Sequence, residues 1–210
     1  MTEAFQASLF DVDQEFGLGD LSGIRRMRLP DGAWLEVMPG WLRGADALFE
    51  RLVATVPWRA ERRPMYDQVV DVPRLLSWYG KGAELPDPAL DEARSVLDAR
   101  YRAELGYGDE LCTAGLCLYR DGRDSVAWHG DTSGRRVKQT IVAILSLGNP
   151  RTLALRPKSG GSATLRFQVG HGDLLVMGGT CQRTWEHAVP KSARATGPRI
   201  SVQFRPEGIH

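Results

Sequence analysis

The sequence predicts an α+β fold, in which helices pack against the outside of one antiparallel β-core. The first half of the 210-residue chain holds two segments with helical periodicity, whereas the second half holds eight short β-type segments separated by Gly, Asp or Pro. Many short strands in succession are typical of a closed or double-sheet core. No linker or repeat divides the halves, so we expect an N-terminal arm over residues 1–30 and a single domain over residues 31–210.

Two helices are expected before the strands begin. Residues 42–56 place apolar side chains at spacings of three and four, and the pattern stops at Pro57. Residues 88–105 repeat the same spacing. Asp87 and Pro88 supply an N-cap followed by a proline at the first helical position, so the second helix has a defined start.

The expected strands follow from about residue 111 onward. Each is a short run of β-type residues that ends at a turn residue. The runs cover residues 111–119, 125–129, 139–147, 152–155, 163–167, 173–177, 185–187 and 199–204. We expect these strands to build the core against which the helices pack.

Composition excludes several classes of protein. Hydrophobic residues make up 42% of the chain and charged residues 25%, as in ordinary globular domains. The longest apolar run, residues 141–145, is far shorter than the ~20 residues of a membrane-spanning helix, so no membrane partner is expected. The acidic N-terminus does not resemble a secretion signal, and the 3 cysteines lack C-x-x-C spacing. We therefore expect a cytoplasmic protein with reduced cysteines.

Charge is divided unevenly along the chain, although its total is only +1. Residues 1–118 carry 13 basic and 20 acidic side chains, a net charge of −7, and residues 119–210 carry 14 and 6, a net charge of +8. This division is either an accidental partition of solvated charge or the mark of a basic functional face in the second half. The total charge alone does not indicate a nucleic-acid partner.

Two of the four histidines lie where a metal site can form. His129 and Asp131 are two residues apart, so on a strand their side chains point to the same face. Together with His187 they make two imidazoles and one carboxylate, the ligand set of non-haem Fe(II) oxygenases. An isolated pair of this kind is more often a histidine hydrogen-bonded to a nearby aspartate. His171, in a glycine-flanked turn, and the C-terminal His210 are poorer candidates.

The last expected strand carries four polar residues on one face. Its period-two alternation separates Ile200, Val202 and Phe204 from the polar set Arg199, Ser201, Gln203 and Arg205. On an edge strand facing water, such a face needs no ligand. Inside a barrel, the two guanidinium groups require anionic partners, and a dicarboxylate would satisfy both.

Four blocks of sequence, taken together, resemble the AlkB family of iron(II)- and 2-oxoglutarate-dependent dioxygenases. The blocks are residues 116–131, 172–179, 185–191 and 199–205, and the resemblance covers roughly residues 65–206. It implies a double-stranded β-helix, or jelly-roll, core over residues 111–206. It also implies that residues 31–110 supply N-terminal helices packed outside this core and a substrate lid.

The resemblance also implies roles for individual residues. The matched iron ligands are His129, Asp131 and His187. The cosubstrate contacts are Arg199 and Arg205, which match the pair that holds the two carboxylates of 2-oxoglutarate, and Tyr119. Cys117 and Ser201 line the same interior but stand where the family often has Asn, so two amide contacts are replaced by weaker groups.

The implied reaction is oxidative dealkylation of N-alkylated nucleic-acid bases, which consumes O2 and releases an aldehyde, succinate and CO2. The substrate would be alkylated DNA or RNA, single-stranded or with a flipped base, bound by a monomer. The candidates for substrate contact are Arg74, Trp78, Tyr79, Arg135, Arg136 and Lys158. Many nucleic-acid repair members carry acidic residues just after the aspartate ligand, where this chain has Arg135 and Arg136 nearby instead.

Two other functions stay open at the level of sequence. The same oxygenase chemistry could act on a protein side chain, a lipid or a small molecule, because the acidic residues after Asp131 are missing. Alternatively, the chain could be a non-catalytic jelly-roll binding protein with a structural or adventitious metal. The presence of the whole set of expected metal and cosubstrate ligands argues against this second alternative.

Overall fold

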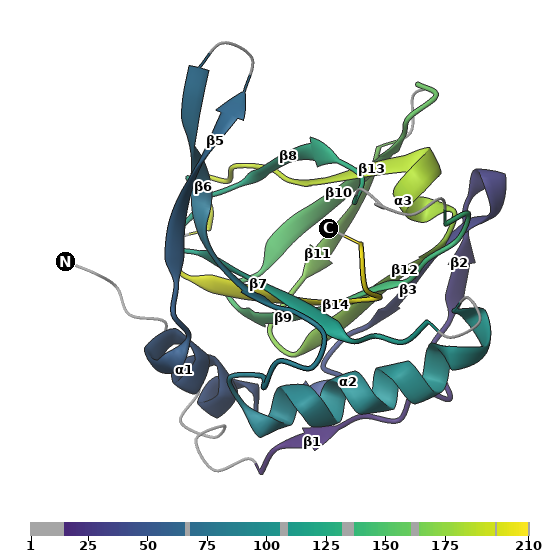
Figure 1. Ribbon diagram of the computed structural model, residues 1–210, viewed down its shortest axis with the longest axis horizontal. Helices are drawn as coiled ribbons and strands as arrows, with labels where there is room; N and C mark the ends of the chain where they lie inside the picture. The colour runs from purple at the N-terminus through teal and green to yellow at the C-terminus, as the bar shows by residue number, and fades with distance from the viewer. Residues whose placement is uncertain are drawn as a thin grey trace.

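The computed structural model describes residues 15–65, 68–105, 109–131, 137–160, 164–195 and 197–209. The chain is mostly antiparallel β-structure with few helices, arranged as two sheets that face each other (Figure 1). The larger sheet runs in the order β2 (Arg26–Arg28), β3 (Ala33–Met38), β12 (Asp173–Gly179), β9 (Val142–Gly148), β14 (Arg199–Arg205), β7 (Thr113–Tyr119), β6 (Gln68–Tyr79) and β5 (Arg59–Met65). The smaller sheet runs in the order β11 (Leu165–Val169), β10 (Arg151–Pro157), β13 (Trp185–Val189) and β8 (Val126–His129).

All eight segments predicted after residue 111 are strands, with bounds shifted by a few residues. The central strand β9 shows why the pattern is strong there. Val142 and Ile144 belong to the apolar cluster between the two sheets, whereas Ala143 and Leu145 belong to the cluster beneath the helices. Because β9 is covered on both faces, its sequence is a continuous apolar run rather than an alternating one.

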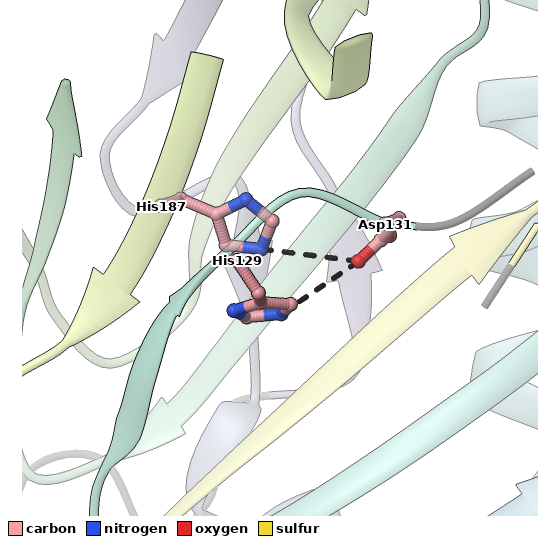
Figure 2. A group of neighbouring side chains, drawn as sticks. All are labelled: His129, Asp131 and His187. Atoms are coloured by element: carbon pink, nitrogen blue, oxygen red, sulfur yellow. Dashed lines mark ion pairs between the residues drawn. The ribbon is translucent and has the colours of Figure 1, made fainter. Parts of the chain in front are cut away.

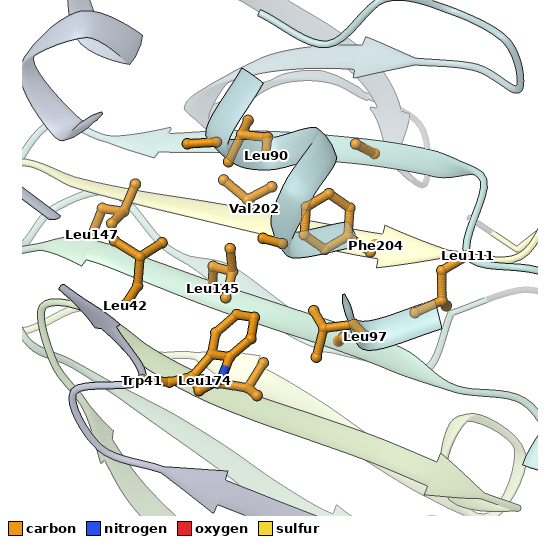
Figure 3. Close-up of a cluster of buried hydrophobic side chains, with 14 of the residues drawn as sticks. Trp41, Leu42, Leu90, Leu97, Leu111, Leu145, Leu147, Leu174, Val202 and Phe204 are labelled. Atoms are coloured by element: carbon orange, nitrogen blue, oxygen red, sulfur yellow. The ribbon is translucent and has the colours of Figure 1, made fainter. Parts of the chain in front are cut away.

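Helices α1 (Ala45–Thr55) and α2 (Pro88–Tyr101) cover the outer face of the larger sheet (Figure 1). The predicted cap of α2 is confirmed, because the Asp87 side chain accepts a hydrogen bond of 3.0 Å from the backbone N–H of Ala89. The buried face of α2 packs against strand residues such as Val202 and Phe204 (Figure 3). This layer fixes β14 from outside, so the opposite face of that strand points between the sheets.

The predicted start of the first helix at residue 42 is wrong. Leu42–Arg43 forms a short strand, β4, which pairs with β1 (Gly17–Leu18). Gly44 then adopts a left-handed conformation with φ of 65°, which ends the strand and lets α1 begin at Ala45. The second helix ends at Tyr101 and continues as a 3-10 turn, Arg102–Glu104, before the predicted limit of 105.

Residues 1–110 contribute more β-structure than expected. Within the expected arm, β2 pairs with β3, so that Arg26 lies opposite Glu36. Residues 31–110, expected to form helices and a lid, also supply β3, β5 and β6 to the larger sheet. β5 is rich in Arg and β6 contains Pro73, features that lower the strand signal and are typical of sheet edges.

A truncation in α2 tests this packing. Leu97 is fully buried, whereas its neighbour Val96 is 37% exposed. Leu97→Ala should lower the free energy of unfolding by about 2–5 kcal/mol, because the cavity adds to the lost transfer free energy. Val96→Ala, the matched control, should cost no more than about 1 kcal/mol. Urea denaturation measures both, and equal costs would contradict the packing of α2 described above.

No helix within the described ranges is long and apolar enough to cross a membrane.

Candidate active site

The three expected metal ligands come together between the sheets. Pairing of β8 with β13 sets His129 opposite His187, and Asp131 lies two residues beyond His129. Asp131 Oδ1 is 3.8 Å from Nε2 of His129 and 3.9 Å from Nε2 of His187 (Figure 2). One possible ligand atom of each residue lies within 4.8 Å of the others, so a single ion could contact all three.

The charges of these three groups suit a divalent cation. Burial opposes ionisation of Asp131, but the positive charge of Arg205 and a 2.6 Å hydrogen bond from its Nε to Asp131 Oδ2 outweigh this effect and lower the Asp131 pKa. Burial, with His129 nearby, lowers the pKa of His187 to about 3. Asp131 is therefore an anion and His187 a neutral imidazole at physiological pH, which are the forms that bind metal.

The tautomer of His129 follows from its neighbour. Nδ1 of His129 lies 2.9 Å from the backbone carbonyl oxygen of Ala127. Because a carbonyl can only accept, Nδ1 must carry the hydrogen, and the lone pair of Nε2 is left for an ion. His171, the poorer candidate, lies instead 3.2 Å from the Asp46 carboxylate and accepts a hydrogen bond from the backbone of Gly148.

A small cavity of about 70 Å³ adjoins the ligands His129 and His187 and is lined by the expected cosubstrate residues. Its lining includes Cys117, Tyr119, His129, His187, Arg199, Ser201, Gln203 and Arg205. The polar face of β14 therefore points to the interior, which decides between the two interpretations of its alternation. Arg199 is 3% exposed and donates a 2.8 Å hydrogen bond from Nε to Ser146 Oγ.

The Arg199 guanidinium can donate a further hydrogen bond to an anionic partner. Its Nη1 is buried and has no hydrogen-bond partner among the residues that the structure describes, and a buried N–H without a partner is costly. Burial raises the pKa of Tyr119 to about 12, so the phenol keeps its proton and can donate. The Tyr119 ring centroid lies 5.3 Å from the guanidinium carbon of Arg199. A carboxylate in this cavity would therefore meet a cation and a hydroxyl donor.

The other β14 residues make contacts that were not expected. Arg205, expected to share the cosubstrate with Arg199, uses its Nε to hold the ligand Asp131 while lining the cavity. Gln203 donates a 2.6 Å hydrogen bond from Nε2 to Ser201 Oγ, and its Oε1 lies 3.7 Å from Cys117 Sγ. An amide is thus present in the cavity even though Cys117 and Ser201 are not Asn.

A larger cavity of about 1100 Å³ adjoins His129 and Asp131 and shares part of its wall with the small one. Arg74 and Trp78 are among its lining residues. Tyr79 does not line it, because side chains alternate along β6 and Tyr79 packs against the helix-side core. Lys158 lines neither this cavity nor the smaller one; its Nζ donates a 3.0 Å hydrogen bond to the backbone oxygen of Gln182. Arg135, Arg136 and His210 lie outside the described residues.

Two residues near the site were not found from the sequence. Ser146 is the one polar residue in the apolar run of β9 and shares the parity of Ile144, so its position on the interior face could have been inferred. Gln182 lies on the four-residue helix α3 (Cys181–Thr184), and its Oε1 accepts a 3.0 Å hydrogen bond from the backbone N–H of Asp131. No periodicity or motif marks Gln182, because its role arises only from chain folding.

Comparison with known proteins agrees with this geometry. Residues 35–205 match the model of the 2OG-Fe(II) oxygenase superfamily. The alpha-ketoglutarate-dependent dioxygenase alkB homolog 3 of Bos taurus is 33% identical over an alignment 195 residues long that covers 82% of this chain and 67% of that protein. The chain belongs to the AlkB family. The predicted family and its cofactors, Fe(II), 2-oxoglutarate and O2, are confirmed, and His129, Asp131 and His187 could bind the metal.

Other AlkB relatives extend the comparison. The human alkB homolog 3 is 32% identical over 186 residues, covering 80% of this chain and 64% of that protein. The DNA oxidative demethylase ALKBH2 of Arabidopsis thaliana is 32% identical over 134 residues, 53% of this chain and 42% of that protein. The structure of OsALKBH1 has a TM-score of 0.59 at 16% identity, covering 86% of this chain and 99% of that one, which shows a shared fold. The chain spans about two thirds of the length of the alkB homolog 3 proteins.

Proposed function

We propose that this AlkB-family chain removes alkyl groups oxidatively from N-alkylated nucleic-acid bases, releasing an aldehyde, succinate and CO2. The observation that carries the proposal is the position of the ligand set between two cavities of different character. His129 and Arg205 line both the small cavity with its buried arginine and the large open one. A dicarboxylate in the small cavity and a bulky substrate in the large one can therefore reach the same centre.

The residues that would hold the cofactors follow from this arrangement. His129, Asp131 and His187 would bind iron, which together with 2-oxoglutarate and O2 supplies the oxidising chemistry when bound. Arg199 and Tyr119 would bind a carboxylate of 2-oxoglutarate, because Arg199 Nη1 has no hydrogen-bond partner in the described part of the chain. Arg205 would keep Asp131 ionised and oriented, with Cys117, Ser201 and Gln203 completing the wall.

The large cavity fits a base that has left its stack. Its volume of about 1100 Å³ exceeds what one base requires, and Trp78, 46% exposed, presents a large aromatic surface within it. A base inside a duplex cannot reach such a cavity, so the substrate would be single-stranded or flipped out at a cost of a few kcal/mol. Arg166 and Lys191 also line the cavity and would contact phosphates.

The facing sheets support the finer description of the fold as a double-stranded β-helix. Within this description, the hairpin of β5 and β6 is the substrate lid, because it projects from the larger sheet at the cavity wall (Figure 1). The relative named as a DNA oxidative demethylase supports a nucleic-acid substrate. A monomeric state and a cytoplasmic location remain predictions; size-exclusion chromatography with light scattering tests the first.

Mass spectrometry of alkylated oligonucleotides tests the proposed function. Single-stranded DNA and RNA oligonucleotides, each with one methylated base, are incubated with the protein, Fe(II) and 2-oxoglutarate. We expect a loss of one methyl group from at least one of them and no change in the unmethylated controls. Consumption of 2-oxoglutarate without demethylation of any oligonucleotide would contradict the nucleic-acid assignment and favour a protein, lipid or small-molecule substrate.

A further inference from the structure

Gln182 contacts the backbone of the turn that carries the metal ligands. The Gln182 side chain is 5% exposed, and its Oε1 accepts the 3.0 Å hydrogen bond from the N–H of Asp131. A backbone N–H can only donate, so the orientation of the amide is determined, and Nε2 turns toward Met177 Sδ at 3.7 Å. Gln182 thus holds the backbone just beyond the end of β8, although it lines neither cavity.

Lys158 braces the same helix from the end of β10. Its backbone N–H donates a 2.9 Å hydrogen bond to the carbonyl oxygen of Thr184, and its Nζ donates one of 3.0 Å to the carbonyl oxygen of Gln182. Although much of the Lys158 side chain is exposed, its ammonium group is committed to α3. Strand β13, which carries His187, begins directly after α3, so both ligand strands are tied to this point.

Gly130, between the ligands His129 and Asp131, shows how closely these groups pack. A Cβ atom at Gly130 would lie 2.4 Å from the Gln182 carbonyl oxygen and 2.7 Å from Lys158 Nζ. Real Cβ atoms essentially never make contacts shorter than 3.0 Å, and the nearer contact here is with backbone rather than with a flexible side-chain end. The position therefore requires Gly because of space, not because of its backbone angles.

We propose that Gln182 and Lys158 are positioning residues that hold the turn from His129 to Asp131 in the geometry needed for metal binding. Gln182 acts directly on the Asp131 backbone, and Lys158 acts through the Gln182 carbonyl. The inference rests on the metal centre of the proposed function, but it assigns Lys158 a role other than contact with a substrate phosphate. Groups that orient metal ligands typically change metal affinity about 10- to 100-fold when they are removed.

Metal titration of four variants tests the inference. Co(II) is the probe, because its visible absorption reports both affinity and coordination geometry. Gln182→Met should weaken Co(II) binding about tenfold or more and alter the spectrum. Lys158→Met should have a smaller effect of the same kind, since its side chain is partly exposed, and Lys158→Arg should restore affinity through its N–H groups. Gly130→Ala should weaken binding at least as much as Gln182→Met.

Matched controls separate positioning from general damage. Gln168→Met removes an amide that bonds Thr152, and Lys81→Met removes an ammonium near Glu110; neither residue lines a cavity. Both control variants should keep the wild-type Co(II) affinity. Thermal unfolding of the metal-free proteins should show that all variants are folded at the assay temperature, and any that are not are replaced by Gln182→Leu or Lys158→Gln.

Two results would overturn the inference. One is unchanged Co(II) affinity and spectrum in both Gln182→Met and Lys158→Met. The other is unchanged metal binding in Lys158→Met with a raised KM for a methylated oligonucleotide, which would make Lys158 a substrate contact. If the variants lose metal affinity as expected while the wild type demethylates no oligonucleotide, the proposed function fails and the positioning role stands.

Discussion

Asp131→Ala should abolish 2-oxoglutarate decarboxylation and weaken divalent-metal binding by more than about 100-fold. This loss exceeds the one expected when a residue that only orients a metal ligand is removed. Asp131 is the only anionic member of the ligand set, and it is 6% exposed. Its loss also leaves Arg205 without the partner that its Nε contacts at 2.6 Å. Removing one member of a buried ion pair costs about 3–5 kcal/mol, so the variant should also unfold at lower temperature.

A second substitution separates metal binding from folding. Asp131→Asn keeps the size of the side chain and an oxygen acceptor for Arg205 but removes the negative charge. It should lose decarboxylation as completely as Asp131→Ala while unfolding closer to the wild type. Asp121→Asn, in an exposed loop where Asp121 pairs with Arg123, is the control and should leave turnover unchanged. Full turnover in Asp131→Asn would show that this carboxylate does not bind the catalytic metal.

Arg199→Met should raise the KM for 2-oxoglutarate by about 100-fold or more, because a buried charge-assisted pair is worth roughly 3 kcal/mol and each 1.4 kcal/mol is a factor of ten. Arg199 is 3% exposed and lines the small cavity, and its Nη1 has no hydrogen-bond partner among the described residues. Co(II) affinity measured without 2-oxoglutarate should change little, since Arg199 is not a ligand. Steady-state kinetics with 2-oxoglutarate as the varied substrate measure the effect.

The charge and geometry of Arg199 are tested by two further variants. Arg199→Lys keeps the charge but loses the planar fork, so its KM should lie between those of the wild type and Arg199→Met. Arg94→Met, on α2 where Arg94 pairs with Asp91, should have the wild-type KM. An unchanged KM in Arg199→Met would remove Arg199 from the cosubstrate site and leave its buried charge without a function.

Local periodicity explains which parts of this site were predictable. The alternation of residues 199–205 depends only on strand geometry, and it appears in the structure. Asp131, by contrast, lies just beyond the end of β8, so strand alternation does not explain its place beside His129. Pairing of β8 with β13, which sets His187 opposite His129, is non-local, and no local pattern of the sequence predicts it. The sequence pattern does not predict that the Tyr79 side chain points away from the large cavity, because residues 68–79 lack a clear strand signal and their alternation cannot be read.

The remaining differences between prediction and structure concern the partner that each charged side chain contacts. Arg205 and Arg199 share one face of β14, and the sequence pattern treats them as an equivalent pair. In the structure, Arg205 Nε bonds the buried carboxylate of Asp131, whereas Arg199 bonds the neutral hydroxyl of Ser146. Lys158 similarly bonds a carbonyl of α3 rather than lining the cleft. Which partner a charged side chain contacts depends on the distances between strands, and the periodicity of the sequence does not specify these distances.

The ratio of aldehyde to succinate tests the central claim most directly. With a single-stranded oligonucleotide that carries one N-methylated base, the wild-type protein should release one formaldehyde for each succinate, because one oxidation of the methyl group accompanies each turnover of 2-oxoglutarate. The ratio should stay near one as oligonucleotide is varied above its KM. Succinate formed at the same rate with methylated and unmethylated oligonucleotides, and without formaldehyde, would contradict the assignment of this AlkB-family site to alkylated bases.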